Sequence, residues 1–131
     1  MISKNGLPEF LLEACPSFKS DWDTFVAEWH EEPDLPLYLA LANFSRHLIA
    51  KLARADTEQF PQIFDAIELL HTDGDSYVRE AAVIGILESL QNAGLHKSTE
   101  PDQFRAFLGP VSEKWWDKLY EFWEKGKLLK D

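Results

Sequence analysis

Residues 76–93 constrain the fold more than any other part of the chain, because apolar side chains surround most of their helical circumference. An amphipathic surface helix needs apolar residues on one face only, whereas a helix that is apolar all round must be covered on several sides. The apolar side chains are Val78, Ala81, Ala82, Val83, Ile84, Ile86, Leu87 and Leu90. The segment therefore predicts a central, buried helix.

Helical periodicity also dominates the rest of the 131 residues, and no run of four or more residues shows the alternation and turn signals of paired strands. The length and the apolar content of 45% are those of one domain. We therefore expect a single all-α domain, residues 1–131, with six or seven helices. The predicted helices are residues 8–14, a second from Ser17 or Ser20 to about residue 32, then 34–54, 57–72, 76–93, 102–108 and 110–125.

A weak internal repeat accompanies these helices. The spacing Asp-x-x-apolar-x-x-x-apolar occurs at residues 34–41 and again at residues 75–82. The segment from Gly74 to Leu87 resembles the Asp-x-x-Val-Arg-x-x-Ala signature of HEAT-like repeats. The resemblance implies antiparallel helix pairs stacked in an array, with Asp75 as the N-cap of its helix. From the sequence, Gly94 is expected to end that helix as a C-cap.

The whole chain also resembles a small family of bacterial all-α proteins of this length that has no assigned activity. The segment from Asp75 to Asn92 carries this resemblance, together with the Leu- and Ala-rich helix before it. The size and acidity of these proteins are similar to those of immunity proteins from bacterial toxin systems. That second likeness is an analogy of size and charge.

The charge balance argues against several classes of partner. Asp and Glu number 23 against 13 Lys and Arg, which gives a net charge of −10 and an isoelectric point near 4.8. A chain of this sign is repelled by nucleic-acid phosphates and by anionic membranes, so we expect neither as a partner. The single cysteine, Cys15, excludes an internal disulfide. No segment of the sequence is apolar enough for a membrane span or a signal peptide, and we expect a cytoplasmic protein.

Sequence motifs for catalysis and for metal or cofactor binding are missing. His30, His47, His71 and His96 share no metal-ligand spacing, and His47 is interpreted as a helix-surface histidine. Residues 73–75 begin like a calcium loop but lack the later ligands of one. No nucleophile elbow or glycine-rich phosphate loop occurs. We therefore predict no catalytic residue, no cofactor and no metal from the sequence.

Acidic side chains are concentrated between residues 56 and 102, which hold ten acidic and two basic residues, a net charge of −8. If these side chains converge, their field would steer a basic protein toward the chain. The alternative is a solvated face that keeps the protein soluble. The acidic candidates for partner binding are Asp65, Glu68, Asp73, Glu80 and Glu88.

The last predicted helix has two apolar stripes, where one would suffice for docking. The second stripe contains Trp116, Tyr120 and Trp123. These aromatic side chains add either to the core or to an interface with a partner or a second copy of the chain. They complete the set of candidate partner-binding residues and make a homodimer through this helix one possible assembly.

Two functions from different classes follow from these features. The first is a non-enzymatic interaction module that offers an acidic or aromatic surface to a basic protein, with a toxin-neutralising immunity protein as its specific form. The second is a hydrolase or metal-dependent enzyme whose carboxylates are grouped only in three dimensions, beside His30, His71 or His96.

Overall fold

The central helix of the computed structural model, which describes residues 1–126, runs without a break from Ser76 to Gln91. It comprises α5 (Ser76–Glu80), the π-helical segment η2 (Ala81–Leu87) and α6 (Glu88–Gln91). The predicted central helix is confirmed, and nearly all of its apolar residues are buried. Two details of the prediction were wrong. The middle of the helix has the wider π geometry, and its end lies at Gln91.

The end of the central helix differs from the prediction because Asn92, instead of Gly94, directs the chain away. The Asn92 side chain accepts a hydrogen bond from the Gly94 N–H at 2.9 Å, within the 3₁₀ turn η3 (Ala93–Leu95). At the other end, the Asp75 carboxylate accepts a hydrogen bond from the Val78 N–H at 2.9 Å. The predicted N-cap is therefore confirmed.

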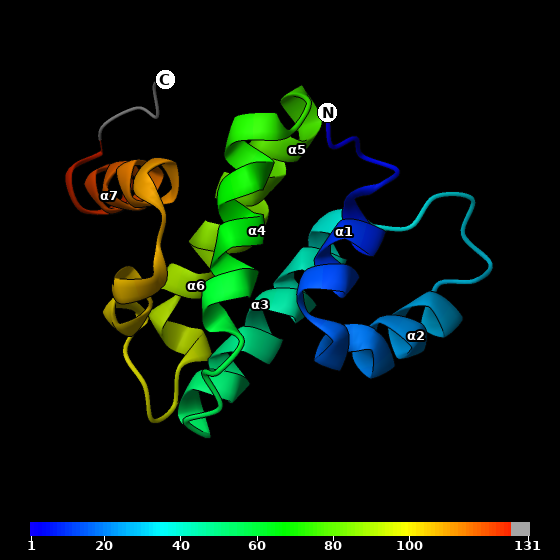
Figure 1. The fold of residues 1–131 in the computed structure, drawn as a ribbon, viewed down its shortest axis with the longest axis horizontal. Coiled ribbons are helices and arrows are strands. Elements are labelled where there is room, and N and C mark those ends of the chain that lie inside the picture. The colour runs from blue at the N-terminus through cyan, green and yellow to red at the C-terminus, as the bar shows by residue number, and fades with distance from the viewer. Residues whose placement is uncertain (127–131) are drawn as a thin grey trace.

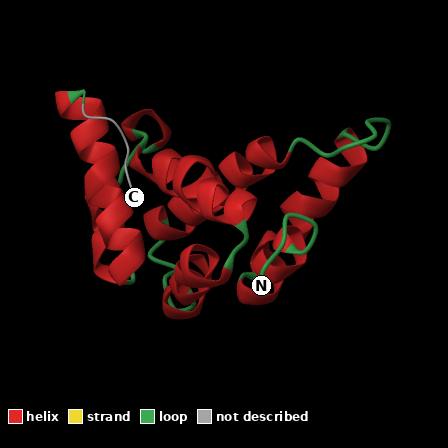
Figure 2. Ribbon diagram, turned by 90° about the horizontal axis from the view of Figure 1, so that it is seen from above, coloured by secondary structure: helices red, strands yellow, loops and turns green. Residues whose placement is uncertain are grey.

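The helices Leu37–Ala53, Phe60–Asp73 and Pro110–Lys125 pack against this central helix, and the first two helices of the chain pack in turn on Phe60–Asp73 and Leu37–Ala53 (Figure 1). The described residues contain seven α-helices and no β-strand, which confirms the predicted all-α fold. Figure 2 shows α2 and α7 at opposite ends of the molecule. The other elements are α1 (Leu7–Ala14), η1 (Pro16–Phe18), α2 (Lys19–Glu28), α3 (Leu37–Ala53), α4 (Phe60–Asp73), η4 (Pro101–Phe107) and α7 (Pro110–Lys125).

Aromatic packing joins η4 to α4. The Phe104 and Phe107 rings lie between 5.0 and 6.0 Å from those of Phe60 and Phe64, measured between centroids. Pairs at these distances contribute roughly 0.5–1.5 kcal/mol each beyond their burial. The segment was predicted as a short helix over 102–108, and its 3₁₀ form over Pro101–Phe107 places both rings against α4.

The start of α7 is fixed by one carboxylate on α4. Glu68 accepts hydrogen bonds from the Val111 N–H at 2.8 Å and from the Ser112 N–H at 2.9 Å. A side chain at Gly109 would collide with Glu68 at 2.6 Å, so glycine is the residue that lets the two approach. Burial raises the pKa of Glu68, but the backbone donors of Ser112 and Val111, together with the Ser112 side chain and His71, outweigh burial and hold the pKa below its ordinary value.

We expect Glu68→Gln to lower the free energy of unfolding by about 1–2 kcal/mol at pH 7, because the amide can accept only one of the two bonds and turns an N–H toward the other donor. The folded-state pKa of Glu68 is lowered, so the stabilisation is present above the unfolded pKa and disappears as the pH falls through the folded one. Urea unfolding at several pH values measures this. Asp65→Asn, an equal charge change at an exposed position of α4, is the control, and an equal loss in both variants would contradict the prediction.

Gly85 permits close contact between the central helix and α3. A Cβ atom there would lie 2.6 Å from Leu41 Cδ1 and 3.3 Å from Leu41 Cβ. We expect Gly85→Val to cost about 1–3 kcal/mol of stability through overpacking. The cost should fall when Leu41→Ala opens the space, which a double-mutant cycle by urea unfolding tests. An undiminished cost in the Leu41→Ala background would show that another contact is responsible.

Candidate functional site

A groove of about 470 Å³ lies between α6 and α7. The central helix and the residue that follows it supply a carboxylate and two amides to one wall, and α7 supplies two aromatic rings and a second carboxylate to the other. The lining residues are Glu88, Gln91, Asn92, Tyr120, Trp123 and Glu124. A volume of this size accommodates one or two side chains of another molecule. We call it the α6–α7 groove.

The α7 wall presents exposed aromatic surface. Trp123 is 60% exposed, although tryptophan side chains are on average highly buried. Tryptophan is also one of the residue types enriched in binding hot spots. The neighbouring Phe122 ring lies 5.0 Å from it, edge to face. Tyr120 is half-buried and packs edge to face on the Trp116 ring at 5.8 Å. Buried Trp116 therefore supports an aromatic surface that continues outward to Trp123.

The central-helix wall contains a carboxylate that forms no ion pair with the described residues. Glu88 is partly buried, and burial raises the pKa of its carboxyl group. No Lys, Arg or His forms an ion pair with Glu88 within residues 1–126. A cation entering the groove would supply the missing charge and lower that pKa again.

A buried amide lies beside this carboxylate. Gln91 is 9% exposed, and its Nε2 donates a hydrogen bond to the Trp116 carbonyl at 2.8 Å. Its Oε1 atom has no hydrogen-bond partner among the described residues. An unpaired buried acceptor costs about 1–3 kcal/mol, so the groove wall favours a ligand that brings N–H donors.

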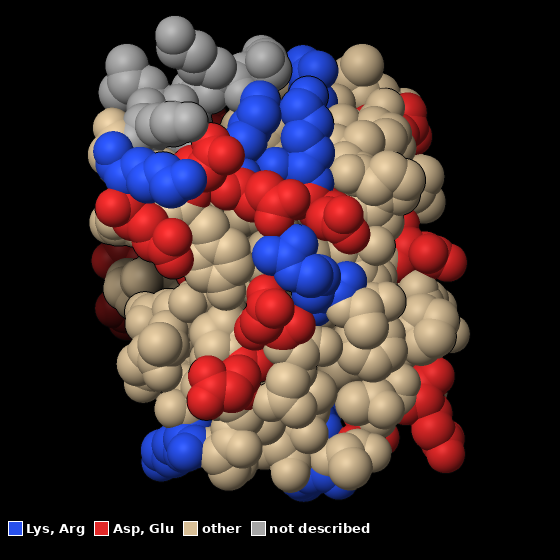
Figure 3. All heavy atoms as spheres, turned by 90° about the vertical axis from the view of Figure 1, so that its left-hand side faces the viewer, with Lys and Arg blue, Asp and Glu red and all other residues tan. Residues whose placement is uncertain are grey.

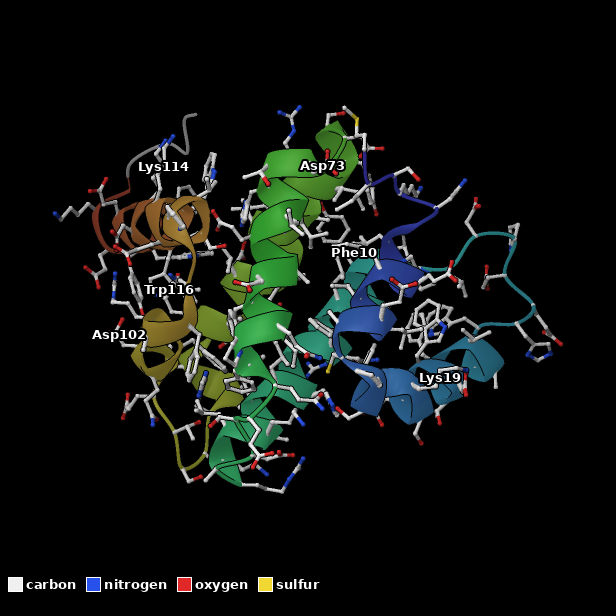
Figure 4. The ribbon with its side chains drawn as sticks, viewed as in Figure 1. Phe10, Lys19, Asp73, Asp102, Lys114 and Trp116 are labelled. Atoms are coloured by element: carbon white, nitrogen blue, oxygen red, sulfur yellow. The ribbon has the colours of Figure 1, made fainter. Side chains whose placement is uncertain are left out.

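Of the candidate residues from the sequence, the structure brings Glu88, Tyr120 and Trp123 together in the α6–α7 groove. Trp116, from the same predicted stripe, is fully buried. Figure 4 shows it on the inner side of α7, near the segment that carries Asp102, whereas Lys114 points outward. Trp116 therefore lies in the core, where its ring contacts the groove residue Tyr120.

The other acidic candidates lie elsewhere. Asp65 and Asp73 are exposed on α4, and Figure 4 shows Asp73 at the far end of that helix. The Glu68 carboxylate accepts hydrogen bonds from the first turn of α7. Glu80 lies near Tyr38, where burial, followed by the charge of Glu80, raises the pKa of the phenol to about 12.

Charges of both signs are interspersed on the α7 side of the molecule (Figure 3). Arg105 donates hydrogen bonds to Asp102 at 3.1 Å and to Asp117 at 2.9 Å, which neutralises part of the acidic charge there. The acidic charge on this side is therefore local and does not form a uniform acidic field.

Sequence reasoning missed Gln91, Asn92 and Glu124 as groove residues. Each lies three or four positions after Glu88 or Tyr120, so helical spacing places it near that residue. The sequence does not show that α6 and α7 lie on opposite sides of one groove.

Among the described residues, no cluster of three or more metal-ligating side chains occurs, and no helix combines the length and hydrophobicity needed to cross a membrane.

We expect Glu88→Gln to stabilise the free protein slightly at pH 7, by no more than about 0.5 kcal/mol. The folded-state pKa of Glu88 is raised, so the ionised wild-type group opposes folding above that pKa. The difference between the two proteins should disappear as the pH falls below the unfolded pKa. Thermal unfolding between pH 3.5 and 7.5 measures it, and a variant less stable than wild type at pH 7 would show that Glu88 holds a structural contact.

A family model matches residues 8–124, which is most of the chain. Its description is a domain of unknown function, DUF7674. No curated protein and no solved structure matches the chain. This match agrees with the resemblance, drawn from the sequence, to an all-α family without assigned activity. The chain belongs to the DUF7674 family.

Proposed function

We propose that this chain is a protein-interaction module and that its α6–α7 groove binds a Lys or Arg side chain of a basic protein partner. One observation carries the proposal, which is the position of exposed Trp123 beside the carboxylates of Glu88 and Glu124 in a single groove. Aromatic faces and carboxylates together are the chemistry that recognises an ammonium or guanidinium group.

The groove offers each part of such a side chain a matching surface. The methylene stem packs on the rings of Trp123 and Tyr120, and the charged head reaches Glu88 or Glu124. An arginine head also presents several N–H donors, which suits the unpaired Oε1 of Gln91. A cation over an aromatic face contributes roughly 0.5–2 kcal/mol, more where water is excluded.

The net charge of −10 favours a basic protein over other partners, because it accelerates encounter with a protein of opposite sign. Neutralisation of a basic toxin, in the manner of an immunity protein, is the specific form of this proposal. A bacterial, cytoplasmic setting and the stacked HEAT-like arrangement of helix pairs belong to the same proposal. They rest on the resemblance of residues 75–92 and on the composition.

A titration with defined peptides tests the proposal. We expect a blocked peptide of alternating Arg and Gly to shift the indole N–H signal of Trp123, with a Kd of about 1 mM, and the matching Glu-Gly peptide to leave it unchanged. The five tryptophans give five indole signals, and Trp123→Phe identifies the relevant one. The measurement is a ¹H–¹⁵N NMR titration of the full chain.

Two double variants separate local recognition from net charge. Glu88→Gln with Glu124→Gln should weaken binding at least about tenfold, because both groove carboxylates are lost. Asp65→Asn with Glu80→Gln removes the same charge from exposed positions elsewhere and should change the Kd less than about twofold. Equal weakening in both would show nonspecific attraction. A Trp123 shift that depends on protein concentration without peptide would instead identify a second copy as the occupant.

A further inference from the structure

Ser17, His47 and Asp21 form a chain of polar contacts at the opposite end of the molecule from α7. Ser17 Oγ lies 2.8 Å from His47 Nε2, and His47 Nδ1 lies 3.4 Å from Asp21 Oδ2. The three residues come from η1, α3 and α2. We propose that Ser17 is a nucleophile, His47 its general base and Asp21 a positioning carboxylate, and that this site hydrolyses carboxylic esters.

The surroundings of His47 suit a base. Its side chain is 12% exposed and lies against the Phe18 ring, whose centroid is 5.6 Å away. Burial lowers the pKa of His47, and this outweighs the raising effect of Asp21. The imidazole is therefore neutral at pH 7. In the tautomer that carries its proton on Nδ1, which lies 3.4 Å from Asp21 Oδ2, the Nε2 lone pair accepts the hydrogen bond from the Ser17 hydroxyl.

Ser17 is placed where a substrate can reach it. The residue is exposed, in the turn between α1 and α2, whereas the base behind it is shielded. The buried thiol of Cys15 lies 3.5 Å from Ser17 Oγ and gives the hydroxyl a second neighbour. Contacts on both sides limit the rotation of the hydroxyl and hold it toward His47.

The adjacent groove indicates the class of substrate. A volume of about 400 Å³ between α2 and α3 is lined by Asp21, Glu28 and His47, and His47 connects it to Ser17, which lies outside the lining. Arg46 and Arg54 also line it. Within residues 1–126, Arg46 donates a hydrogen bond to Asn43 Oδ1 at 3.2 Å, and the one ion pair of Arg54 is a 3.9 Å contact with Asp56. Guanidinium groups bind carboxylates and phosphates, so we expect an ester whose acyl group carries an anionic group.

The reaction balances without a cofactor. Ser17 Oγ bonds to the acyl carbon while its proton passes to His47 Nε2, and the alcohol leaves with that proton when the ester C–O bond breaks. Water then attacks the acyl-serine and gives its proton to His47. The carboxylic acid is released as the serine regains a proton.

Labelling with a fluorophosphonate tests the nucleophile directly. The reagent forms a P–O bond with an activated serine and releases fluoride. We expect one adduct, located on Ser17 by peptide mass spectrometry, formed at least about 100-fold faster than any adduct on exposed Ser20. Equal labelling of Ser17 and Ser20, or none, would overturn the proposal.

Variants assign the two supporting roles. His47→Gln should slow labelling of Ser17 at least about 100-fold, and Asp21→Asn at least about tenfold. Asp21 is exposed, so the second change leaves the fold intact, as circular dichroism will verify for both. Unchanged labelling in both variants would show that the contacts are structural.

The pH dependence gives a readout that a structural role would not produce. Labelling should rise with pH as His47 loses its proton. The charged groups that act on His47 are Asp21 on α2, Lys51 and Arg54 on α3, and Asp56 beyond α3. Asp21→Asn removes the group that raises the pKa of His47, so the profile of that variant should move to lower pH. A profile that does not move would contradict the assignment of His47 as the base.

Hydrolysis assays complete the test. Wild-type protein should cleave the mono-p-nitrophenyl ester of succinic acid faster than p-nitrophenyl acetate, and Ser17→Ala should abolish both activities. Arg54→Ala should reduce the preference for the succinate ester at least about tenfold. Activity that persists in Ser17→Ala would refute the nucleophile.

Discussion

The contact between Glu68 and the first turn of α7 determines where α7 begins and which helix it is attached to. A helix N-terminus exposes N–H donors and the positive end of its dipole, and a carboxylate satisfies both. Here the carboxylate comes from another helix, 43 residues earlier, so one group both caps α7 and attaches it to α4. Each bond to a charged acceptor stabilises the fold more than a neutral one would.

The orientation of α7 then creates the α6–α7 groove. With its start attached to α4, α7 buries Ser112, Trp116 and Leu119. The next turns along the same stripe carry Tyr120, half-buried, and Trp123, 60% exposed. The side chains of this stripe thus become more exposed from Trp116 to Trp123. The exposed end of the stripe becomes one wall of the groove.

Local features of the fold were predictable from the sequence, and long-range features were not. Residues 110–125 and the Asp75 cap were predicted correctly because periodicity and capping act within a few residues. Periodicity also placed Trp116, Tyr120 and Trp123 on one stripe. Periodicity could not predict how deeply each side chain is buried, since burial depends on how α7 packs against the central helix. Glu68 was counted as a surface charge because nothing near it in sequence reveals its partner.

The candidate sites also contain residues that the sequence could indicate and residues that only the structure revealed. Charge and aromatic content identified Glu88, Tyr120 and Trp123, but Gln91 became relevant only when the structure showed its unpaired oxygen. His47 was interpreted as a surface histidine because its polar neighbours, Ser17 and Asp21, lie 26 to 30 residues away in sequence. Folding, and no short motif, brings these groups together.

The two sites can be tested independently because they share no element. The α6–α7 groove belongs to the central helix and α7, whereas the Ser17 cluster belongs to η1, α2 and α3. Figure 2 places α2 and α7 at opposite ends. Packing of α3 on the central helix links them directly, through the close approach of Leu41 to Gly85 and a hydrogen bond from the buried Ser45 hydroxyl to the Ile86 carbonyl. We expect a change in the groove to leave Ser17 chemistry unaltered unless it shifts this contact, since the core separates the local charges at the two ends.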